Sequence, residues 1–305
     1  MGKLQQELLT AAQTITKDFL LGHPIFAPYR EELTIILSGS AAAPYADRYS
    51  GVDLVILGGE EAITAIRRQL AAGNVRFDRD GFAVLPDAAG SLGFRVMFTL
   101  RTFAEAEREL AEYQDFAMVT YPQAPVVYDP QDRYATLVAG PVEYPEDVLV
   151  ELLRRRYQGL RRRRASIAWN FRRGQPFVLL QNLASLLDHA LSICFYLDGR
   201  PPVGRKWLLQ EGLRTTTGRR LRPIIFTLFT NLGDVALLGG TLNIRQNRLY
   251  SLLSQLQDQL EEAIEEAGFT GVLRDSRQAG DEGSPEEGPV EEPLAEDVLA
   301  EEAMS

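Results

Sequence analysis

The chain has 305 residues, of which 45% are hydrophobic and 24% charged, a length that suits two globular domains better than one. A single cysteine, Cys194, excludes an internal disulfide and a cysteine-rich metal site, and two histidines leave little material for a histidine-based zinc site. The formal net charge of −10 is concentrated in residues 275–305, which hold 11 acids and one base; residues 1–274 hold 31 of each. We therefore expect a neutral body with an acidic tail.

The first part of the chain alternates helical and strand-like patterns, which predicts an α+β fold. Residues 3–20 have leucines and other apolar residues near helical spacing. Beyond them, we expect strands at 32–38, 51–57 and 92–100, helices at 59–73 and 102–113, a hairpin at 75–86, and a short extended run at 124–130.

After residue 145 the pattern becomes helical only, with Gly and Pro breaks between helices predicted at 145–172, 176–198, about 221–238 and 244–267. The acidic, Gly- and Pro-rich tail is typical of disorder. We therefore expect four parts: an N-terminal helix (1–24), a mixed-sheet domain (25–140), an all-helical domain (141–272) and a disordered acidic tail (273–305).

The longest apolar segment, at 177–197, approaches the length of a membrane span. It contains Gln181, Asn182, Asp188 and His189, so we interpret it as a buried core helix. The N-terminal segment also lacks the apolar core of a secretion signal. We expect a cytoplasmic protein with no membrane partner.

The motif that carries chemistry lies in "LSGSAAAPYADRYSGVDLVIL", residues 37–57. Gly39 and Ser40 follow one predicted strand, and Asp53 lies on the next strand, 13 residues after Ser40. Small residues at a strand end let backbone amides and a hydroxyl approach a phosphate, and a helix beginning near Ser40 would add its positive end. A carboxylate on the adjacent strand is suited to hold Mg²⁺ against that phosphate. The sequence therefore predicts a phosphate and magnesium site here.

Gly39-Ser40 followed by "ADRYSGVDLVIL" resembles the signature of the nucleotidyltransferase superfamily that includes DNA polymerase beta and kanamycin nucleotidyltransferase. The family pattern is Gly-Ser, a spacer of about ten residues, and then Ser-Asp-hydrophobic-Asp-hydrophobic. "FRVMFTLRTFAEAERELAEY", "VVYDP" and "CFYLDGRPPVGRKWLL" are similar to later family segments, so the resemblance covers about residues 30–270. It implies a nucleotidyltransferase-like mixed-sheet domain, a helical domain, and a site for a nucleoside triphosphate with Mg²⁺.

The chain departs from this pattern at two of the family's three carboxylates. Ser50 and Asp53 keep their places, but Gly51 replaces the first acid of the pair, and the strand that supplies the third acid reads "FRVMFTL". Because residues i and i+2 of a strand face the same side, the family's paired acids converge on the metals, and here only Asp53 is left. Asp53 is thus the single expected catalytic and metal-binding acid, and we expect any transfer rate to fall by about 10³-fold or more.

Two cations of the helical part are candidates for phosphate contact. Arg164 lies within the apolar stripe of the predicted helix 145–172, whereas most other arginines of its clusters fall on solvated faces. We expect Arg164 to meet either an acid of the first domain or a ligand phosphate in the cleft between domains. Lys206, beside Trp207, is the second candidate.

Three functions remain open. The first is a nucleotidyltransferase-like protein that binds nucleoside triphosphate and Mg²⁺ but is catalytically weakened or inactive. The second is an active Mg²⁺-dependent nucleotidyltransferase that moves a nucleoside monophosphate to a small-molecule or protein hydroxyl, with Asp53 helped by Asp47, Asp78 or Asp80. The third, a nucleic-acid-associated protein using the arginine-rich helix, is the least favoured, because the neutral body gives little phosphate affinity. The tail is either a solubilising segment or, through an amphipathic run at 294–304, a site for a protein partner.

Overall fold

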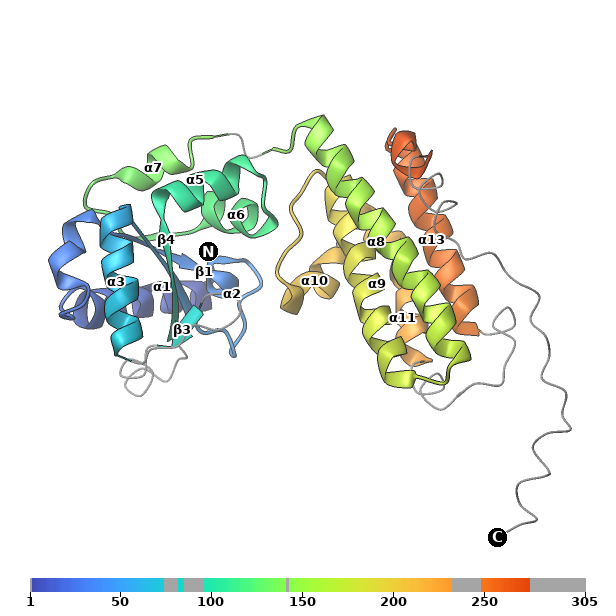
Figure 1. Ribbon diagram of the computed structural model, residues 1–305, viewed down its shortest axis with the longest axis horizontal. Helices are drawn as coiled ribbons and strands as arrows, with labels where there is room; N and C mark the ends of the chain where they lie inside the picture. The colour runs from blue at the N-terminus through green and yellow to red at the C-terminus, as the bar shows by residue number, and fades with distance from the viewer. Residues whose placement is uncertain (1, 74–81, 85–95, 141–142, 232–247, 275–305) are drawn as a thin grey trace, which may run out of the picture.

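The computed structural model describes residues 2–73, 82–84, 96–140, 143–231 and 248–274 (Figure 1). The chain is α+β, with a mixed sheet and its covering helices followed by a helical part. Several expectations fall outside the described residues. They are the tail from residue 275, most of the hairpin at 75–86 with Asp78 and Asp80, residues 92–95, and the segments at 232–238 and 244–247.

The sheet has five strands in the order β3-β4-β2-β1-β5. The strands are β1 (Thr34–Ser38), β2 (Val52–Gly58), β3 (Phe82–Val84), β4 (Val96–Thr102) and β5 (Val126–Tyr128). β2 and β4 run parallel, and the other neighbouring pairs run antiparallel. The β-branched and apolar runs of the sequence thus form a mixed sheet, as predicted.

Helices cover both faces of this sheet (Figure 1). On one face lie α1 (Lys3–Ile15), its π-helical continuation (Thr16–Leu20) and α3 (Glu60–Ala72). On the other lie α5 (Phe103–Ala111), α6 (Asp115–Thr120) and α7 (Arg133–Leu137). Neighbouring residues of β1 face opposite sides, so Ile35 and Leu37 pack in the first cluster and Ile36 in the second. Two apolar layers therefore sandwich the sheet.

The helical part has an apolar cluster of its own. Its helices are α8 (Glu146–Arg172), α9 (Pro176–Leu197), α10 (Arg205–Gly212), α11 (Thr216–Thr230) and α13 (Arg248–Glu266). α8 and α9 approach closely at Gly159, where a Cβ atom would lie 2.6 Å from the His189 ring. A side chain at this crossing would therefore force the His189 ring to shift.

α11 begins at Thr216, so the predicted start near residue 221 was wrong. Thr215 caps this helix by accepting a hydrogen bond from the Gly218 backbone N–H at 3.0 Å. The Asp198 carboxylate accepts another from the backbone N–H of Thr216 at 3.1 Å. These two caps provide acceptors for the N–H groups of Thr216 and Gly218 in the first turn. Pro223 lies further along, inside the helix.

Among the described helices, α9 is long and apolar enough to cross a membrane by length and composition. Of its most apolar window, 56% is buried within the protein, and the core helix of a soluble protein passes the same test. Burial against α8, α10 and α11 therefore accounts for much of its apolar character.

Candidate functional site

The predicted phosphate turn and the strand acid lie side by side. β1 ends at Ser38, the one-turn helix α2 (Gly39–Ala42) follows, and Ser38 pairs with Asp53 in the antiparallel register of β1 and β2. The Ser38 hydroxyl also donates to the Asp53 carbonyl at 3.1 Å. The expected helix start near Ser40 is confirmed, but four residues add few aligned peptide dipoles, so hydroxyl and backbone groups define this turn.

Gly39 is required at this turn for two reasons. Its φ is +64°, a left-handed conformation that residues with a Cβ rarely adopt. A Cβ atom built at this position would lie 2.3 Å from Asp53 Oδ2, well inside van der Waals contact. The backbone of the turn therefore packs directly on the Asp53 carboxylate.

A chain of hydroxyl contacts leads from this turn to Asp47. Ser40 Oγ donates to Ser50 Oγ at 2.9 Å, and Ser50 Oγ donates to Asp47 Oδ1 at 3.1 Å. The backbone N–H groups of Asp47 and Tyr49 complete the loop by donating to Ser50 Oγ at 3.0 Å and to Asp47 Oδ1 at 3.0 Å. Ser50 is 4% exposed, so hydrogen bonds among the residues of the turn and the loop, rather than water, stabilise this loop. Sequence reasoning placed Ser40 and Ser50 in the site but missed how Asp47 is linked to them.

The strand next to Asp53 presents a thioether where the resemblance led us to look for an acid. Asp53 pairs with Met97 in the parallel register of β2 and β4, and paired residues share a face of the sheet. Gly51 precedes β2 by one residue. Among the described residues, no group of three or more His, Cys, Asp or Glu side chains is arranged to hold a metal ion. The ligands present are hard oxygens, a carboxylate beside hydroxyls, which suit one Mg²⁺ better than a pair.

The helical part reaches this site through α10, which lies between the two parts in Figure 1. Lys206 Nζ lies 3.9 Å from Asp47 Oδ1. The structure thus brings Lys206 to the loop that carries Ser50, and its contact with a phosphate stays a prediction. It does so through an acid, Asp47, that we had weighed only as a metal ligand.

An aromatic contact accompanies this ion pair. The Tyr45 and Trp207 rings lie 4.9 Å apart between centroids, tilted by 40°. Burial raises the pKa of the Tyr45 phenol, the nearby Glu211 carboxylate raises it further, and Arg200 partly offsets both. Tyr45 therefore stays neutral and packs as an aromatic body on α10.

Arg164 contacts neither the Asp47 loop nor α10 in the described residues. Its guanidinium donates to Gln257 Oε1 at 2.6 Å and to Ser254 Oγ at 2.7 Å, and it lies 5.2 Å from the centroid of the Tyr250 ring. All three residues belong to α13. The expected pairing of Arg164 with an acid of the first domain is therefore wrong among the described residues, and its contact with a phosphate stays a prediction. The apolar stripe places Arg164 on the inner side of α8, where the neighbour is α13.

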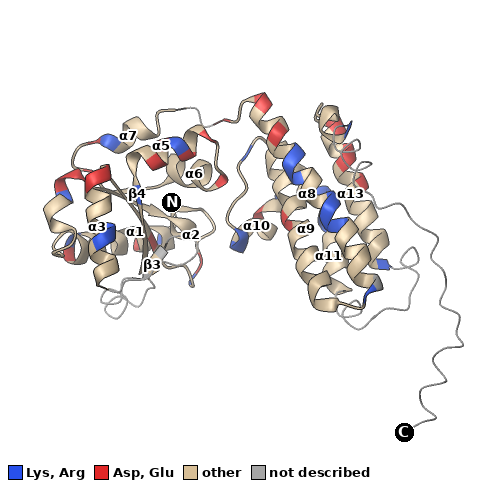
Figure 2. Cartoon of the chain, in the orientation of Figure 1, with Lys and Arg blue, Asp and Glu red and all other residues tan. Residues whose placement is uncertain are grey.

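A second set of charges joins the two parts around Asp115, at the start of α6. Its carboxylate accepts from Arg156 Nη2 at 2.8 Å and from the Tyr196 hydroxyl at 2.7 Å. Asp188 of α9 lies 3.8 Å from Arg156 and 3.3 Å from Arg205. Burial and then Asp115 raise the pKa of Tyr196, against an opposing effect of Arg156, so its hydroxyl remains a donor. Figure 2 shows basic residues along α8 and on α10.

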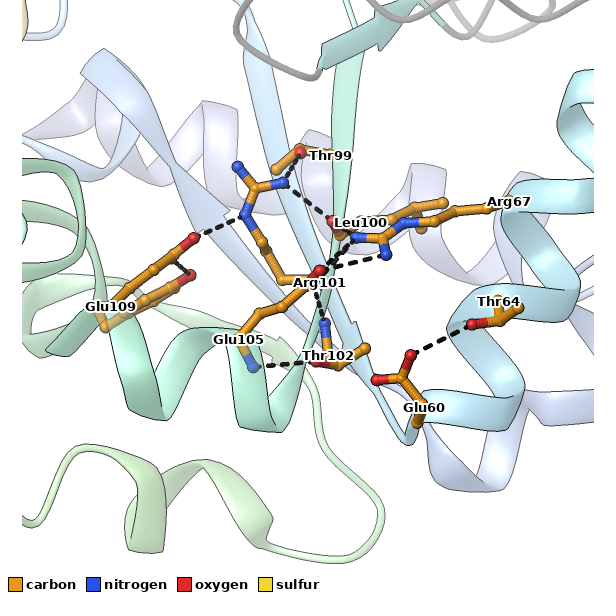
Figure 3. A network of polar contacts seen from close by, with 10 residues as sticks. Glu60, Thr64, Arg67, Thr99, Leu100, Arg101, Thr102, Glu105 and Glu109 are labelled. Carbon is orange, nitrogen blue, oxygen red and sulfur yellow. Dashed lines mark hydrogen bonds and ion pairs between the residues drawn. The ribbon is translucent and has the colours of Figure 1, made fainter. Parts of the chain in front are cut away.

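The opposite end of the parallel strand pair holds a separate charge network (Figure 3). Arg101 Nε donates to Glu109 at 3.1 Å, and Arg67 donates to Glu105 at 3.0 Å and to the Leu100 carbonyl at 3.0 Å. Glu105 also closes a capping box with Thr102 at the start of α5. These charges are paired within one part of the molecule, which indicates a structural role.

Comparisons with known proteins add little to this geometry. No protein-family model matches the chain, and no curated protein matches its sequence. Among solved structures, a nucleotidyltransferase-like protein from Exiguobacterium sibiricum 255-15 is similar, with a TM-score of 0.42 and 14% identity, over 89% of this chain and 80% of that chain. A likeness of this size records a weak relationship in fold and carries no argument about the site.

Proposed function

We propose that the chain is a nucleotidyltransferase-like protein that binds a nucleoside triphosphate with Mg²⁺ at Gly39, Ser40, Ser50 and Asp53. We propose further that its transfer activity is weakened or absent. The observation that carries this proposal is the contact between the Gly39 backbone and the Asp53 carboxylate, where even a methyl group would overlap. It supports a site in which a phosphate on the turn and a cation on the strand acid are neighbours.

The loss of activity follows from the acids around Asp53. Gly51 and Met97 occupy the two positions from which further carboxylates would converge on a second metal. Bound Mg²⁺ would supply charge neutralisation at the phosphate, and Asp53 with the Ser40 hydroxyl would hold it, while Ser50 positions Ser40. Without a second carboxylate, the negative charge available to hold a second cation is small. We therefore propose that nucleotide binding is retained while transfer activity is weakened or lost.

The active transferase remains the second candidate, and Asp47 is the observation that favours it. Its carboxylate is joined to the turn through Ser50 and Ser40, so one more acid belongs to the same loop. The nucleic-acid function is not favoured. Within α8, Arg156 is engaged by Asp115 and Arg164 by Gln257 and Ser254, which removes two cations from any basic face.

Calorimetric titration of ATP with Mg²⁺, alongside an assay of pyrophosphate release, tests the proposal. We expect the protein to bind ATP in the presence of Mg²⁺, and Asp53→Asn to weaken binding by about tenfold or more because the cation loses its charged ligand. Gly39→Ala should weaken it as strongly, since the added methyl group displaces Asp53. Asp258→Asn, an exposed change on α13, is the matched control and should leave binding unchanged.

Pyrophosphate release separates the two candidates. Release at or near background, with a gain on Gly51→Asp, supports the weakened protein, because that acid would share a side with Asp53. Rapid release that requires Asp53 would instead establish the active transferase. If none of the four common nucleoside triphosphates binds, the proposed site is wrong.

A further inference from the structure

Four side chains form a clasp between the loop of the candidate site and α10, namely Tyr45, Asp47, Lys206 and Trp207. Asp47 and Lys206 are an ion pair at 3.9 Å, and the two rings are 4.9 Å apart. Lys206 Nζ also lies 5.0 Å from the centroid of the Trp207 ring. One cation of the helical part is thereby held beside the phosphate turn by an acid of the loop.

The two partners of the ion pair are held very differently. Asp47 Oδ1 accepts from the Tyr49 backbone N–H and from Ser50 Oγ, so the loop keeps this carboxylate in place without Lys206. The Lys206 side chain is 57% exposed and that of Asp47 is 37% exposed. A long, solvated pair of this kind is weak, and a lysine stem is flexible. Lys206 can therefore exchange partners while Asp47 stays.

The closed clasp also leaves a donor unsatisfied. The indole N–H of Trp207 is buried and donates to no described residue. A buried donor without a partner disfavours the arrangement that contains it. The clasp is thus a contact that a competing ligand can displace.

We propose that Asp47 is a built-in competitor for Lys206, occupying in the free protein the place that a phosphate takes when a polyphosphate binds. A triphosphate carries several negative charges and many acceptor oxygens, so it outcompetes one carboxylate, whereas a monophosphate gains far less. The clasp would then weaken binding of every phosphate that uses Lys206, and a triphosphate has the charge needed to displace Asp47. This inference rests on the proposed function and assigns its ligand class to Lys206 and Asp47.

The two variants have opposite expected effects on the affinity for ATP with Mg²⁺. Asp47→Asn preserves an oxygen for Tyr49 and Ser50 but removes the charge, so affinity should rise by about threefold as Lys206 is released. Lys206→Met should lower affinity by about fivefold. In the double variant the gain from Asp47→Asn should vanish, because the competitor acts through Lys206. The ratio of ATP to AMP affinity should rise in Asp47→Asn, because AMP gains less from the released Lys206. Lys17→Met and Asp258→Asn are charge-matched controls, both at exposed positions.

Amine acylation read by mass spectrometry provides a direct view of Lys206. The sequence contains three lysines, Lys3, Lys17 and Lys206, so two of them serve as internal controls. ATP with Mg²⁺, or inorganic tripolyphosphate, should protect Lys206 and leave the other two unchanged. In the free protein, Asp47→Asn should increase acylation of Lys206 alone.

The outcomes distinguish this inference from the function on which it rests. If ATP binds in an Asp53-dependent manner but neither Asp47→Asn nor Lys206→Met changes its affinity, the competition is wrong and the proposed function stands. An equal gain from Asp47→Asn with and without Lys206 would show general charge repulsion and likewise overturn the competition. If neither ATP nor tripolyphosphate binds or protects Lys206, both proposals fail.

Discussion

At the two ends of one face of the sheet, charged side chains find their partners in different parts of the molecule. Asp53 and Arg101 lie on the same face of the paired strands β2 and β4, since Asp53 pairs with Met97 and Leu57 with Arg101. Four residues, or about 13 Å, separate these two rows. At the Arg101 end, Arg101 of β4 pairs with Glu109 of α5, and Arg67 of α3 pairs with Glu105 of α5 (Figure 3). At the Asp53 end, the loop acid Asp47 takes its cation from α10 of the helical part.

The ion pairs at the two ends differ in the solvent exposure of their side chains. The Arg101 and Glu109 side chains are 23% and 14% exposed, and several hydrogen bonds hold both. The pair between Lys206 and Asp47 is longer and more than a third exposed on both sides. Pairs of the first kind are expensive to break, whereas pairs of the second kind are nearly neutral for stability. Ion pairs of similar residue types therefore stabilise the fold at one end, and at the other end the pair is weak enough for the exchange of partners that we propose.

The largest effect on stability is expected for Arg101→Met. The change should lower the free energy of unfolding by about 2 kcal/mol, because Glu109 is then left partly buried with the Tyr121 hydroxyl as its remaining described donor. Urea denaturation followed by circular dichroism measures this difference. Arg108→Met, an exposed change on α5, the helix that carries Glu109, is the control. A loss equal to that of the control would remove the structural role assigned to the network.

A smaller effect, dependent on pH, is expected at Glu105. Burial raises the pKa of its carboxyl, but hydrogen bonds from Arg67 and the Thr102 backbone, together with the charges of Arg67 and Arg101, outweigh burial and leave that pKa lowered. The folded state then binds fewer protons than the unfolded state around the ordinary carboxyl value of 4.5, so its stabilisation falls as pH falls through that range and below.

Glu105→Gln should therefore be less stable than the wild type by about 1 kcal/mol near pH 7, and this gap should narrow below about pH 4.5. Denaturation curves at several pH values measure it. Glu107→Gln, exposed on the same helix, should follow the wild type at every pH. A gap that widens on acidification would reverse the sign assigned to this carboxyl.

The smallest effect on stability is expected for Lys206→Met. Loss of a long, exposed ion pair should change the free energy of unfolding by less than about 0.5 kcal/mol. The same denaturation experiment, with Lys17→Met for comparison, measures it. A loss above about 1 kcal/mol would place Lys206 with the structural charges and weaken its assignment to a ligand.

Much of the fold and the centre of the site could be predicted from the sequence. The strands, the long helices α8 and α9, and the proximity of Gly39 and Ser40 to Asp53 follow from local patterns, because apolar periodicity and neighbouring strands are short-range features. The capped start of α11 and the short helices α6 and α10 were missed. Their signals are a few capping or polar residues, which resemble loop chemistry in a sequence.

The sequence alone determined the α+β class and the acid-poor composition of the candidate site, since both depend on which residue types occupy which segments. Only the tertiary structure decided which cation reaches that site. Helical periodicity placed Arg164 on the inner side of α8 but not its neighbour, which proved to be α13, while α10 brought Lys206 to Asp47. A helical stripe specifies a direction around one axis, whereas contacts between distant segments depend on how whole helices and sheets pack.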